Sequence, residues 1–116
     1  MPNEIRPSQA LHLWHDVTFD LVRDNQPDLS ARQLAVLLTV YLEPPPHTVR
    51  ALAAKLGVTK PVITRALDTM GRMGLLTRKR DAADRRNVLV HRTLAGALAV
   101  EKIGDMIIAR HREMPL

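Results

Sequence analysis

The chain of 116 residues contains no cysteine, and this absence excludes several classes of function. Without thiols there is no disulfide framework, no thiol nucleophile and no cysteine-ligated zinc site. Long hydrophobic runs are also missing. The longest, residues 34–42, is interrupted by Thr39 and is far shorter than the roughly 20 residues of a membrane span. Residues 1–9 are polar and are not followed by the apolar core of a signal peptide. We therefore expect a cytoplasmic protein with no membrane partner.

Aromatic side chains are scarce, at 3% of the chain, and all of them precede residue 42. A core must therefore be built mainly from Leu, Val, Ile, Ala and Met. Leu, Ala and Met favour helices, whereas aromatic residues are enriched in strands. With 46% hydrophobic and 25% charged residues, the composition is that of an ordinary globular protein. Its length suits one domain. The composition predicts a single, mainly helical domain.

The net charge of +5 is unevenly distributed along the chain. Residues 50–92 contain eleven Lys or Arg and three acids, a local charge of +8. The remainder contains six basic residues and nine acids, a charge of −3. A basic segment between mildly acidic ends is typical of a surface that binds a polyanion. Charge alone leaves a merely solvated basic surface as an equal alternative.

Apolar periodicity, helix caps and helix breakers predict five helices and one hairpin. We expect helices at residues 8–26, 30–43, 48–57, 59–74 and 94–112, and strands at 75–80 and 87–92. The second helix has the clearest signals, because Ser30 can cap it, Gln33 completes a capping box, and the three prolines at 44–46 stop it. The prediction is one winged-helix domain over 1–116, with an N-terminal helix (8–26), a winged core (29–93) and a C-terminal helix (94–112).

Three residues indicate a helix-turn-helix in the basic segment. Ala53 is small enough for the close approach of two helices, and Gly57 can adopt the positive φ of a tight turn. Ile63 would fasten the second helix onto the first. Two helices joined by so short a turn must cross steeply, as in DNA-binding helix-turn-helix units. A helical hairpin that binds no DNA remains the alternative at this point.

The second of these helices would present polar residues to a DNA major groove. If its apolar residues 63, 66, 67 and 70 face inward, helical geometry turns Lys60, Pro61, Thr64, Arg65 and Asp68 outward. Arg65 can then hydrogen-bond guanine, while Thr64 and Pro61 can contact a thymine methyl group. The alternative is a face that is merely solvated.

The hairpin that follows is rich in arginine and lysine. Six such residues lie within fifteen positions: Arg78, Lys79, Arg80, Arg85, Arg86 and Arg92. A basic hairpin tip can straddle a phosphate backbone and place an arginine in the adjacent minor groove. Asp84 stands among these cations, and we interpret it as an intramolecular partner that orients Arg86 or Arg65. An ordinary turn aspartate is the alternative interpretation.

Taken together, four parts of the sequence resemble the MarR family of bacterial winged-helix regulators. They are residues 52–65 (LAAKLGVTKPVITR), 74–78 (GLLTR), Asp81 and 84–86 (DRR). The resemblance extends over residues 29–96. It implies a sequence-specific regulator of transcription that binds double-stranded DNA, with Asp84 and Arg86 in the family's wing pattern. It also implies that the wing enters the minor groove through Arg86, and we expect Arg78 and Arg85 to bind DNA as well. The implied major-groove residues are Thr59, Lys60, Pro61, Thr64 and Arg65.

The sequence departs from the family pattern at two places. Arg92 occupies a position where the family usually has leucine, and we expect it to loosen the packing or to contact a phosphate. Family members are typically longer and dimerise through the first helix and two C-terminal helices, whereas this sequence has residues for one such C-terminal helix. We still expect a homodimer, with a monomer as the alternative. The expected contact residues are Trp14, Val17, Leu21, Val100, Ile103 and Ile107, which alternatively cover the small core.

Other functions receive little support from the sequence. His12 and His15, with Asp16, supply only two convincing ligands where zinc needs three or four, so we expect no metal. We find no glycine-rich phosphate loop or nucleophile motif, and expect neither an enzyme nor a cofactor. The resemblance suggests a small-molecule effector between the winged part and the terminal helices, but few aromatics predict a small pocket or none. The competing function is a winged helix that docks an acidic protein.

Overall fold

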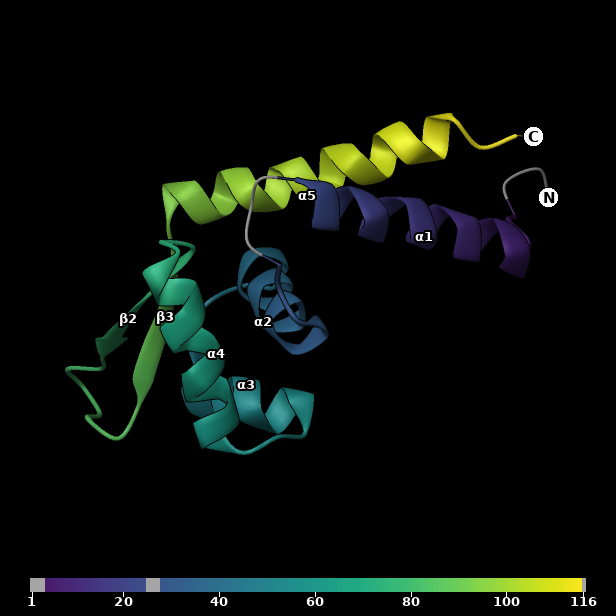
Figure 1. The fold of residues 1–116 in the computed structure, drawn as a ribbon. Helices are drawn as coiled ribbons and strands as arrows, with labels where there is room; N and C mark the ends of the chain where they lie inside the picture. Colours follow the sequence, from purple (N-terminus) through teal and green to yellow (C-terminus); the bar gives the residue numbers. More distant parts are fainter. Residues whose placement is uncertain (1–3, 25–27, 116) are drawn as a thin grey trace. The chain divides into compact units, whose positions relative to one another are not determined.

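The computed structural model describes residues 4–24 and 28–115, which form a mainly helical fold with a β-hairpin wing (Figure 1). The elements in chain order are α1 (Pro7–Arg23), α2 (Ala31–Leu42), β1 (His47–Thr48), α3 (Val49–Leu56), α4 (Lys60–Arg72), β2 (Leu76–Arg80), β3 (Val88–Arg92) and α5 (Leu94–Arg112). The predicted fold class is confirmed. The predicted extension of the first helix to residues 25 and 26 lies outside the described residues.

The chain divides into two compact units. The winged unit is Leu29–Val100, and the terminal unit combines Met1–Asp28 with Glu101–Leu116. Helix α5 contributes its residues 94–100 to the first and 101–112 to the second. No helix in residues 4–24 and 28–115 combines the length and the apolar character that a membrane crossing requires.

Helix α2 is closed at both ends by hydrogen bonds. At its start, the Ser30 hydroxyl accepts from the Gln33 backbone N–H and the Gln33 side chain accepts from the Ser30 N–H, as the capping box predicts. At its end, Arg92 of β3 donates from Nε to the Val40 carbonyl at 2.8 Å and from Nη2 to the Glu43 carbonyl at 2.9 Å. The last carbonyls of a helix lack intrahelical donors, so Arg92 satisfies them. The expectation that Arg92 loosens the packing was therefore wrong, and its contact with a phosphate stays a prediction.

The turn between α3 and α4 has the predicted geometry. Gly57 ends α3 with a φ of 69°, in the left-handed region, and its N–H bonds the Ala53 and Ala54 carbonyls. Thr59 precedes α4 as its N-cap residue, although its side chain makes no capping hydrogen bond. Ile63 is fully buried where the two helices meet. The predicted helix-turn-helix is thus confirmed at its turn and at its core.

The sheet has three antiparallel strands in the order β1-β3-β2. Strands β2 and β3 form the predicted hairpin, each beginning one residue later than expected, with Leu76 opposite Arg92 and Arg80 opposite Val88. Strand β1 was not predicted, and its His47 pairs with Val90 of β3. Two residues are too few for an alternating pattern, so only the pairing with β3 makes this segment a strand.

The core of the winged unit is aliphatic, as the composition predicts. Its largest fully buried side chains come from α2, α3, α4 and β2, and are Leu37, Leu52, Ile63, Leu67, Met70, Leu76, Val36 and Val40. Tyr41 adds a polar connection, because its hydroxyl donates to the Leu75 carbonyl at 2.7 Å and accepts from the Thr93 N–H at 2.9 Å. One side chain thereby ties α2 to both ends of the hairpin.

Candidate nucleic-acid interface

Helix α4 buries one face and exposes the other, following its 3.6-residue period. Its buried residues are Ile63, Ala66, Leu67 and Met70. On the opposite face Lys60, Pro61 and Arg65 are exposed and Thr64 is half-buried, next to the exposed N-cap residue Thr59. Pro61 is tolerated because the N–H that it lacks belongs to the first helical turn, where no carbonyl accepts it. The start of α4 therefore presents donors, a cation and an apolar ring to solvent.

The tip of the hairpin is held in shape by short-range hydrogen bonds. The Asp81 N–H donates to the Asn87 carbonyl at 3.0 Å, and the Asn87 N–H donates to the Asp84 carbonyl at 2.9 Å. The Asp81 carboxylate accepts from the Ala83 N–H at 2.9 Å. The wing thus has a defined turn that carries its arginines.

Asp84 forms a two-point pair with Arg86 within this tip. The Arg86 Nε and Nη2 atoms each lie 3.1 Å from a carboxylate oxygen of Asp84, and the Arg86 backbone N–H donates to the same carboxylate. These bonds, and the nearby charge of Arg50, hold the pKa of Asp84 below its usual range. Arg86 nevertheless remains 78% exposed. Of the two partners considered for Asp84, the structure pairs it with Arg86.

A second ion pair connects α4 to the wing. Asp68 points outward from α4, as its position predicts, and its carboxylate accepts a hydrogen bond from Nη2 of Arg78 on β2. Sequence reasoning missed this contact, because the two residues lie on different elements and no local pattern joins them. Arg78, one of the predicted DNA-binding residues, is therefore already engaged with a carboxylate.

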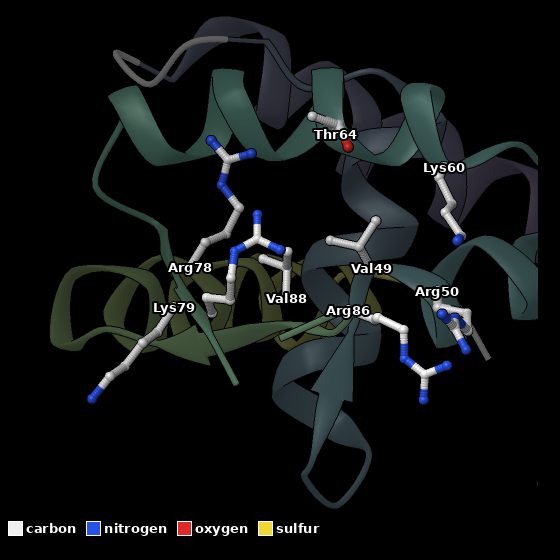
Figure 2. A pocket seen from close by; sticks show the side chains of 9 residues that line it. Val49, Arg50, Lys60, Thr64, Arg78, Lys79, Arg86 and Val88 are labelled. Carbon is white, nitrogen blue, oxygen red and sulfur yellow. The ribbon is translucent and has the colours of Figure 1, made fainter. Parts of the chain in front are cut away.

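An open cavity of about 440 Å³ lies between the starts of α3 and α4 and the hairpin. Its lining is mostly cationic, with an apolar contribution from Val49 and Val88 (Figure 2). Four predicted residues line it: Lys60, Thr64, Arg78 and Arg86. Three further cations line it that were not predicted to contact DNA: Arg50, Lys79 and Arg80. Thr59, Pro61, Arg65, Asp84 and Arg85 are not part of this lining.

Arg50 is the most informative of the additional cations. It is the second residue of α3, two positions after the N-cap Thr48. Its place at the start of the basic segment was visible in the sequence, but no motif assigned it a role. The cavity brings it together with residues of α4 and the wing, which lie ten or more positions away.

The predicted dimer contacts differ in their exposure. Trp14 is 54% exposed and Ile107 is 40% exposed, whereas Leu21 and Ile103 are half-buried. Val17 is buried at 1% exposure, and Val100 packs against the winged core, so neither presents an open surface. The same two helices expose apolar residues that were not predicted, among them Leu11, Val22 and Ile108.

The histidines of α1 form a surface row with Phe19. His12 contacts His15 edge-on, and His15 stacks on Phe19 while its Nδ1 lies 3.0 Å from an Asp16 carboxylate oxygen. In the part of the chain that the structure describes, no group of three or more His, Cys, Asp or Glu is placed to hold a metal ion.

A family model described as the MarR family matches residues 29–88, which is more than half of the chain. The chain belongs to the MarR family. This is a family of winged-helix, DNA-binding transcriptional regulators, so the chain is classed with regulators of transcription and not with enzymes.

Solved structures show the same fold. The transcriptional regulator Tm0710 from Thermotoga maritima aligns with a TM-score of 0.75 at 24% identity, over 91% of this chain and 72% of that one. The repressor CouR, bound to a 23-mer DNA duplex, aligns at 0.72 and 24% identity, over 91% and 72%. The MepR–DNA complex of S. aureus aligns at 0.65 and 20% identity, over 91% and 77%. No curated protein sequence matches the chain.

Proposed function

We propose that this MarR-family chain binds double-stranded DNA in a sequence-specific manner through one face of its winged unit. In this proposal α4 is the recognition helix. Thr59, Lys60, Pro61, Thr64 and Arg65 at its start enter the major groove, and Arg86 at the wing tip enters the adjacent minor groove. Arg78 and Arg85 add positive charge along the wing. Because it binds chromosomal DNA in this proposal, we infer that the protein works in the cytoplasm.

The observation that carries the proposal is the basic cavity shared by the recognition helix and the wing. Six Lys or Arg side chains from α3, α4 and the hairpin line it, together with Thr64. Cations converging from several elements suit a polyanion that passes over all of them. Two proteins of the same fold, CouR and MepR, have been crystallised with DNA.

We further propose a homodimer formed through the terminal unit. Members of the MarR family typically dimerise, and paired recognition helices suit two-fold DNA sites. The exposed apolar residues of α1 and α5 support this assignment. Leu11, Trp14 and Val22 fall on one side of α1 at helical spacing, and Ile107 and Ile108 are exposed on α5. Of the contacts predicted from sequence, Trp14, Leu21, Ile103 and Ile107 remain in this proposal.

The test is a selection of duplexes from a random library, followed by anisotropy titrations of the unchanged chain over a salt series. Arg65→Ala should relax the preference at one base position by ~1–3 kcal/mol, because it removes a base contact. Arg86→Ala should weaken binding on every duplex, because the wing arginine acts mainly through its positive charge near the phosphates.

Arg32→Ala is the matched control, since Arg32 is an exposed arginine at the start of α2, outside the cavity lining. It should leave both properties unchanged. No binding to any duplex at low salt would contradict the proposal, and would favour a module that docks an acidic protein. Retention of full affinity by Arg86→Ala would contradict the role given to the wing.

A further inference from the structure

The cations of the basic cavity differ in whether a carboxylate already neutralises them. Arg78 is paired with Asp68, and Arg86 is paired with Asp84. Among the described residues, the other four lining cations, Arg50, Lys60, Lys79 and Arg80, take part in no ion pair. Arg80 donates from Nη1 to the Arg85 carbonyl, and Lys79 extends away from Arg50 and Lys60 (Figure 2). Arg50 and Lys60 are therefore the uncompensated charges that share one side of the cavity, whereas Arg78 and Arg86 are each held by a carboxylate.

Arg50 and Lys60 reach this wall from different helices. Arg50 lies in the first turn of α3 and Lys60 is the first residue of α4. Figure 2 shows the nitrogen ends of Arg50, Lys60 and Arg86 on one side of the cavity, while Arg78 extends toward α4. The positive charge of Arg50 helps to lower the pKa of Asp84, so Arg50 lies near the Asp84–Arg86 ion pair of the wing.

The proposed DNA-binding mode determines what must pass through this region. A recognition helix in the major groove and a wing in the adjacent minor groove lie on opposite sides of one sugar-phosphate strand, because that strand separates the two grooves. The cavity occupies the space between the helix and the wing. In this binding mode a phosphate of that strand therefore lies in the cavity.

We propose that Arg50 and Lys60, with Arg86 at the edge, form a site for one phosphodiester group of the DNA backbone between the two grooves. The inference rests on the proposed function and deepens it by adding Arg50, a residue of α3, to the DNA contacts. A guanidinium offers paired N–H donors that match two phosphate oxygens, and the Lys60 ammonium adds a point charge. The half-buried Thr64 hydroxyl supplies a neutral donor to the same cavity.

Such a site would set the depth and angle of the recognition helix, and it would read no base. The positively charged group of Arg50 belongs to neither the recognition helix nor the wing. A phosphate held by all three elements therefore fixes their common position on the duplex. Contacts of this kind set register and orientation without carrying sequence information.

The first experiment compares Arg50→Gln with Arg32→Gln in the full chain. Both arginines are the second residue of a helix that follows a Ser or Thr N-cap with a side-chain capping bond, so the two changes are matched in charge and local structure. For Arg50→Gln, we expect the slope of log affinity against log salt to shrink by ~0.9, the value for one phosphate. The loss should be equal on a selected duplex and on an unrelated one. Arg32→Gln should keep the slope of the unchanged chain.

The second experiment identifies the anion. Single methylphosphonate linkages, which lack the phosphate charge, are placed one at a time along the selected duplex. One position on the strand between the grooves should weaken Arg50→Gln clearly less than it weakens the unchanged chain, because the Arg50 contact is already gone while Lys60 and Arg86 still contact that phosphate. Circular dichroism should show that both variants keep the fold.

The outcomes separate this inference from the proposed function. If Arg50→Gln keeps the full salt slope while Arg86→Ala weakens binding, the phosphate site is wrong and the DNA-binding proposal stands. If the slope changes but no methylphosphonate position couples to Arg50, the cavity binds a free anion and the inference is overturned. If the unchanged chain binds no duplex, both proposals fail together.

Discussion

The contact between Tyr41 and Gly96 shows how one residue position limits the side chains that fit where α2 meets the start of α5. Gly96 is buried in the first turn of α5, and a methyl group at its Cα would overlap the Tyr41 hydroxyl and the Leu75 carbonyl oxygen. Thr93 adds two hydrogen bonds at this contact, because its hydroxyl donates to the Gly74 carbonyl at 2.7 Å and accepts from the Gly96 N–H at 2.9 Å. Glycine is needed here for the close approach of a phenol and a carbonyl.

Gly96→Ala should therefore lower the free energy of unfolding by about 1–3 kcal/mol or more, as overpacking of a buried site does. Gly104→Ala is the control, since Gly104 lies in the same helix and an added methyl group meets nothing within 4 Å. That change should be neutral or stabilise the protein by up to about 1 kcal/mol, from helix propensity. Denaturant unfolding measures both, and equal effects of the two changes would refute the argument.

At the scale of elements, ion pairs join α1 to α5 in the terminal unit. Arg110 of α5 donates from Nη2 and Nε to the two carboxylate oxygens of Asp20 at 2.7 and 2.8 Å. Lys102 donates to Asp24 at 2.9 Å. The hydrogen bond from Arg110 lowers the pKa of Asp20 below its ordinary value of 3.8, and the same bond raises the pKa of Arg110. The pair thus favours one alignment of the two helices.

The pH dependence follows from the sign of this shift. Because the pKa of Asp20 is lower in the folded chain than in the unfolded chain, the unfolded chain takes up the proton first. The stabilisation by the pair is therefore present above the ordinary value of 3.8 and is lost as the pH falls below it. We expect Asp20→Asn to be less stable than the unchanged chain at pH 7, and the difference to shrink toward pH 3.

Thermal unfolding over this pH range measures the effect. Asp105→Asn is the control, because Asp105 is an exposed acid of α5 that forms no ion pair among the described residues. It should leave the pH dependence of the unchanged chain intact. A constant difference between Asp20→Asn and the unchanged chain at pH 3 and pH 7 would count against the pair.

At the scale of the whole molecule, the proposed dimer makes the terminal unit testable apart from DNA binding. Light scattering should give a mass of roughly twice the 13.0 kDa of the chain, since two-fold pairing is the common closed assembly. Trp14→Lys should yield a monomer, because it puts a charge on the exposed apolar side of α1. Ile107→Lys should act in the same way from α5.

His12→Lys is the control for the dimer. His12 is exposed on the same helix, and at 100° per residue it lies about 160° from Trp14, about 100° from Leu11 and about 80° from Val22 around the helix axis. It should leave the dimer intact. A monomeric unchanged chain, or a dimer that survives both Trp14→Lys and Ile107→Lys, would show that these residues only cover the core.

The sequence by itself determined the parts of this protein that depend on local chemistry. The Ser30–Gln33 capping box, the left-handed Gly57 and the buried face of α4 each follow from residues within a few positions of one another. The hairpin was predictable because the helical spacing of apolar residues ends before it. Its basic character was predictable from the number of Arg and Lys residues in that segment. These features were predictable because caps, turns and periodicity act over one or two helical turns.

Only the tertiary structure decided the contacts between distant residues. Arg92 closes α2 from about fifty positions away, Asp68 engages Arg78 across two elements, and Arg50 joins the wing at one cavity. The two-residue strand β1 exists because β3 lies beside it. A guanidinium can pair with a carboxylate, a helix end or a phosphate with similar ease, so its sequence neighbours do not choose among them. The choice is made by the backbone geometry that brings one of these partners within reach.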